Sequence, residues 1–103
     1  MLHLDENSNG ATVDLTVGEV LEIQLAENPT TGFRWQVQAD GEPVCQPVDD
    51  RFESPGGPPG RGGTHVWHFR ACRTGTGQID MVYRRSWETA AAKTFTLHVR
   101  VQA

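Results

Sequence analysis

The chain has 103 residues and a mass of 11.4 kDa, and its 13 acidic and 9 basic residues give a formal net charge of −4. This length holds one ordinary hydrophobic core, which excludes a multidomain enzyme, and the acidic balance excludes the basic surface that nucleic acid binding requires. No apolar run reaches the roughly 18 residues of a membrane span. We therefore expect one soluble globular domain over residues 1–103, without a membrane partner and monomeric when free.

The amino terminus gives the expectation for localisation. Residues 1–6 have neither the basic nor the apolar region of a signal peptide. A chain that is complete as given is expected in the cytoplasm, whereas a trimmed signal peptide would place it in the periplasm or outside the cell.

Period-two alternation of apolar and polar residues predicts β-strands along the whole chain. The expected strands are residues 13–16, 21–25, 33–38, 67–71, 78–84 and 94–101, with a weaker edge strand at 44–53 that Pro and Asp interrupt. The alanine run at 88–93 is too short for more than one helical turn. Seven short strands with turns between them predict an all-β, immunoglobulin-like antiparallel β-sandwich.

The phase of the alternation predicts which side chains form the core. The residues expected to face inward are Val13, Leu15, Leu21, Ile23, Leu25, Phe33, Trp35, Val37, Trp67, Phe69, Ala71, Ile79, Met81, Tyr83, Phe95, Leu97, Val99 and Val101. Their neighbours in the alternation, Glu22 among them, are expected to face solvent. Trp35 and Trp67 are the predicted core tryptophans, whereas Trp87 follows a strand and is expected outside the core.

Three connections are long and unusual in composition, at residues 26–32, 54–63 and 85–92. They are the second, fourth and sixth connections. If each strand reverses its predecessor, even-numbered connections lie at one end of the sandwich. The parity therefore predicts three elaborate loops at one pole of a rigid scaffold, an arrangement typical of binding proteins.

The sequence does not predict an enzyme, a cofactor or a metal site. It has neither a nucleophile elbow nor a phosphate-binding loop. His65 and His68 are three residues apart, which places them on opposite faces of a strand and disfavours shared metal ligation. Cys45 and Cys72 allow one disulfide or two free thiols, and the sequence leaves both alternatives open.

Three short motifs occur in order along the chain. They are Asn28-Pro29-Thr30-Thr31-Gly32-Phe33, then Gly60-Arg61-Gly62-Gly63, then Arg85-Ser86-Trp87. Together they resemble the three binding motifs of the chagasin family, immunoglobulin-like inhibitors of papain-like cysteine peptidases. Ser86 departs from the family pattern, which has proline at this place.

The resemblance implies a reversible, tight-binding inhibitor that occludes the active-site cleft of a papain-like cysteine peptidase with three loops. It places Thr30 and Thr31 near the catalytic Cys and His, the glycine-rich loop on one side and Trp87 against an aromatic residue on the other. All residues of the three motifs are thus expected to bind the peptidase, whose identity the sequence leaves open. The alternative is an immunoglobulin-like adhesion or carbohydrate-binding module, which would also use exposed tryptophan and glycine-rich loops.

Overall fold

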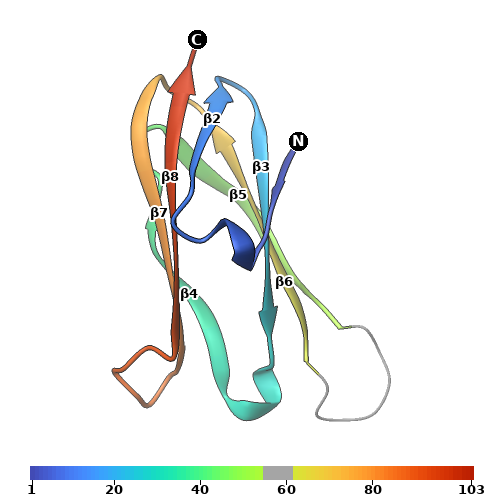
Figure 1. Ribbon diagram of the computed structural model, residues 1–103. Helices are drawn as coiled ribbons and strands as arrows, with labels where there is room; N and C mark the ends of the chain where they lie inside the picture. The colour runs from blue at the N-terminus through green and yellow to red at the C-terminus, as the bar shows by residue number, and fades with distance from the viewer. Residues whose placement is uncertain (55–61) are drawn as a thin grey trace.

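The computed structural model describes residues 1–54 and 62–103, which form a sandwich of two four-stranded sheets (Figure 1). One sheet has the order β1-β3-β6-β5 and the other the order β2-β8-β7-β4. The elements in chain order are β1 (Leu2–Leu4), the 3₁₀ turn η1 (Glu6–Ser8), β2 (Thr12–Thr16), β3 (Val20–Glu27), the 3₁₀ turn η2 (Pro29–Thr31), β4 (Phe33–Asp40), β5 (Cys45–Glu53), β6 (Gly63–Ala71), β7 (Gly75–Arg85) and β8 (Lys93–Gln102).

The predicted sandwich is confirmed, with two differences in detail. Strand β1 was not predicted, because three residues are too few to display an alternation. Two pairings are parallel, β1 with β3 and β2 with β8, while the other four are antiparallel. The weak strand at 44–53 exists as β5 and lies at a sheet edge, as predicted. The alanine run forms no helix and belongs to the irregular connection before β8.

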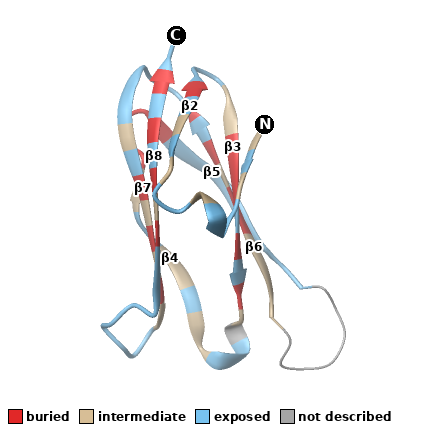
Figure 2. Ribbon diagram, viewed as in Figure 1, coloured by how far each residue is buried: buried red, intermediate tan, exposed pale blue. Residues whose placement is uncertain are grey.

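The core lies between the two sheets, where the inward faces of the strands are buried (Figure 2). The predicted phase is confirmed for the buried residues Leu15, Leu21, Ile23, Leu25, Trp67, Phe69, Ala71, Ile79, Met81, Tyr83, Phe95, Leu97, Val99 and Val101. The predicted burial of Val37 was wrong: Val37 keeps the predicted phase, since it pairs with the buried Met81, but it is exposed because β4 is an edge strand of its sheet. The prediction was also wrong for Glu22, which is buried among polar side chains of the outer face.

The β3–β4 loop, the β7–β8 loop and the ends of β5 and β6 lie at one pole of the molecule (Figure 1). The register agrees, because Glu27 at the end of β3 pairs with Gly63 at the start of β6, and Phe33 pairs with Arg85. The carboxyl terminus lies at the opposite pole, where the Val17 amide donates to the Gln102 carbonyl. The described part of the chain thus agrees with the grouping of loops that parity predicts.

Both cysteines are free thiols, so the structure does not form the disulfide that the sequence left open. Cys45 is buried, and its burial raises the pKa of the thiol to about 11, with smaller contributions from the charges of Cys72 and Asp40. In the described ranges, 1–54 and 62–103, no helix is long and apolar enough to cross a membrane.

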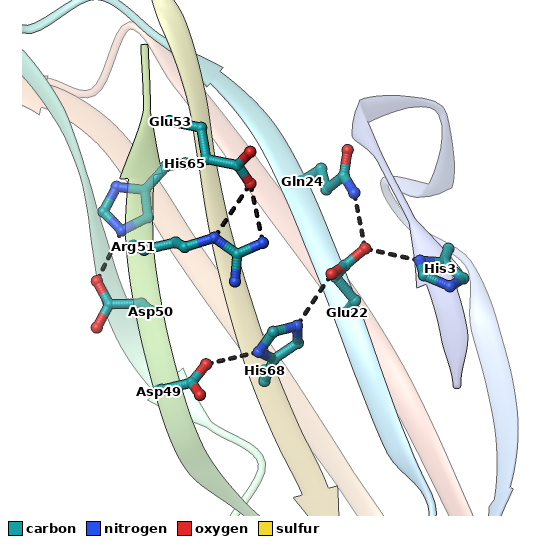
Figure 3. A network of polar contacts seen from close by, with 9 residues as sticks. All are labelled: His3, Glu22, Gln24, Asp49, Asp50, Arg51, Glu53, His65 and His68. Carbon is teal, nitrogen blue, oxygen red and sulfur yellow. Dashed lines mark hydrogen bonds and ion pairs between the residues drawn. The ribbon is translucent and has the colours of Figure 1, made fainter.

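A row of alternating histidines and carboxylates crosses the outer face of the sheet β1-β3-β6-β5 (Figure 3). His3 lies 2.6 Å from Glu22, the Nε2 of His68 lies 2.9 Å from the other oxygen of Glu22, and Asp49 contacts the Nδ1 of His68. Hydrogen bonds from His68 and Gln24 lower the pKa of the Glu22 carboxyl to about 2, against the opposing effect of its burial. The carboxylates of Glu22 and Asp49 raise the pKa of His68. The row ties all four strands of the sheet together.

We expect Glu22→Gln to lower the thermal unfolding midpoint near neutral pH. Because the folded pKa of Glu22 lies below its unfolded value of about 4.5, the charged carboxylate contributes stability above that value and loses it as pH falls toward 2. The difference in unfolding midpoint between the parent and Glu22→Gln should therefore become smaller as the pH falls from about 4.5 to about 2. Glu53→Gln is the control, since it removes an ion pair with Arg51 that is more than half exposed and contributes little. A difference for Glu22→Gln that is independent of pH would contradict the account.

Candidate functional site

The β3–β4 loop is held in a tight turn by hydrogen bonds that it makes to itself. The side-chain oxygen of Asn28 accepts from the amide of Thr30 at 3.2 Å and from its hydroxyl at 2.6 Å. The carbonyl of Asn28 accepts from the amide of Thr31 at 3.2 Å and from its hydroxyl at 2.8 Å. This is the pattern with which Asn begins a helical turn, and here it starts η2. The loop is therefore shaped before any partner arrives.

An aromatic group on the second sheet anchors both ends of this loop. The amide of Asn28 donates to the hydroxyl of Tyr83 at 3.0 Å. The ring of Tyr83 packs on Phe33, with centroids 5.3 Å apart, and on Trp35, with centroids 4.9 Å apart. Phe33 thus anchors the loop to the scaffold, as its inward phase predicts.

Trp87 of the β7–β8 loop packs against Gly32 of the β3–β4 loop. Gly32 has a φ of +84°, which side-chain-bearing residues rarely adopt, and a Cβ built there would lie 2.6 Å from the Cη2 of Trp87. The bare backbone therefore makes room for the indole. Trp87 is nevertheless 70% exposed, so most of its surface is available to a partner.

Arg85 joins the same two loops through its guanidinium. Its Nε donates to the carbonyl of Thr31 at 3.2 Å, and its Cζ lies 4.5 Å from the ring centre of Phe33 and 5.8 Å from that of Trp87. Its Nη1 lies 3.3 Å from a carboxylate oxygen of Glu88. Arg85 is therefore engaged within the site, which gives it a structural task beside the predicted binding role.

The glycine-rich segment reaches the β3–β4 loop at Gly62. A Cβ on Gly62 would lie 3.2 Å from the Glu27 carbonyl and 3.4 Å from the Cβ of Asn28, so backbone passes close to backbone here. Gly63 follows as the first residue of β6 and pairs with Glu27. The predicted site residues Gly60 and Arg61 lie outside the described residues.

The structure brings together the predicted residues that it describes, namely Asn28, Pro29, Thr30, Thr31, Gly32, Phe33, Gly62, Gly63, Arg85, Ser86 and Trp87. Sequence reasoning missed Glu27 and Tyr83 as parts of this pole. Tyr83 was placed in the core, and Glu27 was placed in a loop, where a charged residue is unremarkable. For Glu27, the one feature of the sequence that could have pointed to a role at this pole is its position directly before the short polar turn that starts at Asn28.

The site offers a binding surface and no catalytic centre in the part of the chain that the structure describes. His65 and His68 have separate carboxylate partners, and across residues 1–54 and 62–103 no three His, Cys, Asp or Glu side chains are arranged to hold a metal ion. What this pole presents is a capped turn, a glycine backbone and an exposed indole. Groups of this kind can bind a partner by non-covalent contact.

Comparison with known proteins identifies the family. A model of the chagasin family peptidase inhibitors matches residues 14–99 of the chain. The chain belongs to the chagasin family. Among its relatives, Amoebiasin-1 of Entamoeba histolytica is 37% identical, with 98% of this chain and 100% of that protein covered. Chagasin of Trypanosoma cruzi is 36% identical, with 89% of this chain and 90% of that protein covered.

The fold of this chagasin-family chain also matches solved structures. The crystal structure of the cysteine protease inhibitor EhICP2 from Entamoeba histolytica superposes with a TM-score of 0.87 at 23% identity, covering 98% of this chain and 95% of the other. The resemblance drawn from the three motifs is thus confirmed, as is the prediction of a cysteine peptidase inhibitor rather than an enzyme. The roles of the individual loop residues stay predictions.

The close contact at Gly32 predicts that a methyl group there disturbs the site. We expect Gly32→Ala to destabilise the protein by more than Gly10→Ala, and to change the fluorescence of Trp87. Both glycines have nearly the same φ, +84° and +83°, but nothing lies within 4 Å of a Cβ at Gly10. The control should therefore show only the backbone cost of about 1–2 kcal/mol. Equal destabilisation in urea unfolding, with unchanged fluorescence, would show that Trp87 does not depend on the bare Gly32 backbone.

Proposed function

We propose that this cysteine peptidase inhibitor closes the active-site cleft of papain-like enzymes with the pole formed by its β3–β4, β5–β6 and β7–β8 loops. The observation that carries the proposal is the convergence at Gly32, where the first motif packs directly on the third. The β3–β4 loop would enter the centre of the cleft, with the glycine-rich segment on one side and Trp87 on the other. Binding is non-covalent and reversible.

The shape of the β3–β4 loop explains how such an inhibitor blocks an enzyme without being cleaved. Peptidases hold a substrate backbone in extended form, whereas Pro29–Thr31 form a 3₁₀ turn. The four hydrogen bonds accepted by Asn28 hold the turn closed. A scissile bond in this turn is not presented in the geometry that the catalytic groups require.

The loops also lose little conformational freedom when they bind. The β3–β4 loop is capped, anchored on Tyr83 and clamped by Arg85 in the free protein. Ordering a loop opposes association, so a surface ordered in advance binds more tightly for the same contacts. Trp87 adds a large rigid side chain of the type most enriched among residues that dominate interface energy.

Titration of papain-type peptidases with the purified protein tests the proposed function. We expect residual activity to fall linearly to zero at one inhibitor per active enzyme and to return on dilution. Thr31→Tyr should remain folded, since Thr31 is exposed, but should inhibit weakly because a bulky ring does not fit a narrow cleft. Thr31→Ala should weaken inhibition only modestly, because it removes one of the four hydrogen bonds that Asn28 accepts and adds no bulk. Undiminished peptidase activity at excess inhibitor would favour an adhesion or carbohydrate-binding module instead.

The Trp87→Ala variant tests how much the β7–β8 loop contributes to inhibition. Because the side chain is 70% exposed, the substitution should change the unfolding midpoint little. The inhibition constant should rise by about 30-fold or more, which corresponds to roughly 2 kcal/mol of a hot-spot contact. Val17→Ala serves as the control, since Val17 is an exposed apolar residue at the opposite pole. Equal inhibition by the Trp87→Ala variant and the parent would remove the third loop from the interface.

Ser86→Pro tests the departure from the family pattern. The amide of Glu88 donates to the carbonyl of Arg85 at 3.1 Å, which makes residues 85–88 a β-turn with Ser86 in its second position. Proline is favoured there because its ring fixes the φ that the turn requires. We expect the variant to dissociate several-fold more slowly, in line with about 0.4–1 kcal/mol of lost disorder in the free chain. Faster dissociation of a fully folded variant in surface plasmon resonance would contradict this account.

A further inference from the structure

A buried carboxylate lies at the base of the β3–β4 loop. Glu27 is the last residue of β3 and is only 2% exposed. One oxygen accepts from the backbone amide of Trp35 in β4 at 2.8 Å, and the other lies 3.0 Å from the Nδ1 of His65 in β6. Glu27 therefore joins the strand that enters the loop to the strand that leaves it, and both to β6.

His65 lies between two carboxylates. Its Nε2 lies 2.7 Å from a carboxylate oxygen of Asp50 in β5 (Figure 3), while its Nδ1 faces Glu27. A neutral imidazole carries a single N–H and donates once, whereas the imidazolium donates from both nitrogens. Two carboxylate partners that are both ionised can be satisfied together only by the charged ring. The ring is held flat on Trp67, with centroids 4.0 Å apart and planes 4° from parallel.

The strands joined by this contact are the ones that carry two of the inhibitory loops. Glu27 directly precedes Asn28, His65 follows Gly63 and Thr64 at the start of β6, and Asp50 belongs to the strand that leads into the glycine-rich segment.

The charged groups around His65 are mainly acidic. Besides Glu27 of β3 and Asp50 of β5, the groove that His65 lines includes Asp40 of β4 and Asp49 of β5.

We infer that Glu27 and His65 are positioning residues for inhibition, and that the second ring proton of His65, which lets the ring donate to Glu27 and Asp50 together, holds the base of the β3–β4 loop against that of the β5–β6 loop. The inference rests on the proposed function, because it concerns the placement of those loops. Its consequence is regulation by acidity: the inhibitor binds its peptidase more tightly when His65 is charged. Loss of the proton removes one of the two hydrogen bonds and leaves an oxygen of Glu27 or of Asp50 without its donor.

His68 provides a matched control within the same strand. It also lies between a glutamate of β3 and an aspartate of β5, Glu22 and Asp49, but on the outer face of the sheet and away from the loops. A substitution of His68 therefore removes the same chemistry from the same sheet without touching the base of the β3–β4 loop.

The experiment measures the dissociation constant of the inhibitor with papain at about pH 5 and about pH 8, for the parent and for His65→Gln, Glu27→Gln and His68→Gln. Taking the ratio of each variant to the parent at each pH cancels the titration of the peptidase itself. Unfolding midpoints are recorded under both conditions, to separate loss of affinity from loss of fold.

The three variants should behave differently. His65→Gln should bind about tenfold more weakly at the lower pH and close to the parent at the higher, the size of one charge-assisted hydrogen bond. Glu27→Gln keeps an acceptor for the Trp35 amide and gains a donor for a neutral His65, so it should match the parent at the higher pH and weaken at the lower. His68→Gln should lose stability without a pH-dependent change in affinity.

The experiment distinguishes a failure of the proposed function from a failure of this inference alone. A parent that does not inhibit overturns the proposed function together with this inference. A parent that inhibits, with ratios for His65→Gln and Glu27→Gln that are independent of pH or equal to that of His68→Gln, overturns only the inference. If Glu27→Gln fails to fold, the His65→Gln and His68→Gln pair still decides the outcome.

Discussion

The contact between the Trp87 indole and the bare backbone of Gly32 is the constraint on which the proposed inhibitory pole depends. It exists because Gly32 adopts a φ of +84° and carries no Cβ, so that the two loops approach without an intervening side chain. Arg85 completes the contact by donating to Thr31 and covering the ring of Phe33. Two loops that are more than fifty residues apart in sequence therefore behave as one surface, and the orientation of either is fixed by the other.

The sheet that supports this surface is held by charge as well as by apolar burial. Its inward face contributes to the hydrophobic core. On its outer face, and at its end nearest the loops, histidines of β6 lie between glutamates of β3 and aspartates of β5. Such contacts are satisfied only in a limited range of protonation states, because both oxygens of a carboxyl group are free to accept only while it is ionised, and a histidine donates twice only while it is charged. The two histidines thus link the same three strands through carboxylate contacts, one near the loops and one remote from them.

Sequence reasoning recovered the parts of the fold that follow from periodicity. Runs such as 94–101 alternate without interruption, so β8 and its buried face were predictable, and parity then placed the loops. The failures have local causes. Val37 is exposed because β4 lies at the edge of its sheet, a position that no alternation reveals, and β1 is too short to show an alternation. Glu22 is buried because three polar side chains from neighbouring positions cover it, a property of the assembled sheet rather than of the strand.

The separation of the two poles has a practical consequence for handling the molecule. The described residues extend 46 Å along the longest axis, and the carboxyl terminus lies at the pole opposite the loops (Figure 1). A linker, fluorophore or second domain attached after Ala103 would point away from an enzyme docked at the proposed inhibitory pole. The chain can therefore be immobilised on a sensor surface, or displayed on a carrier, by its last residue with Trp87 and the capped turn facing the solution.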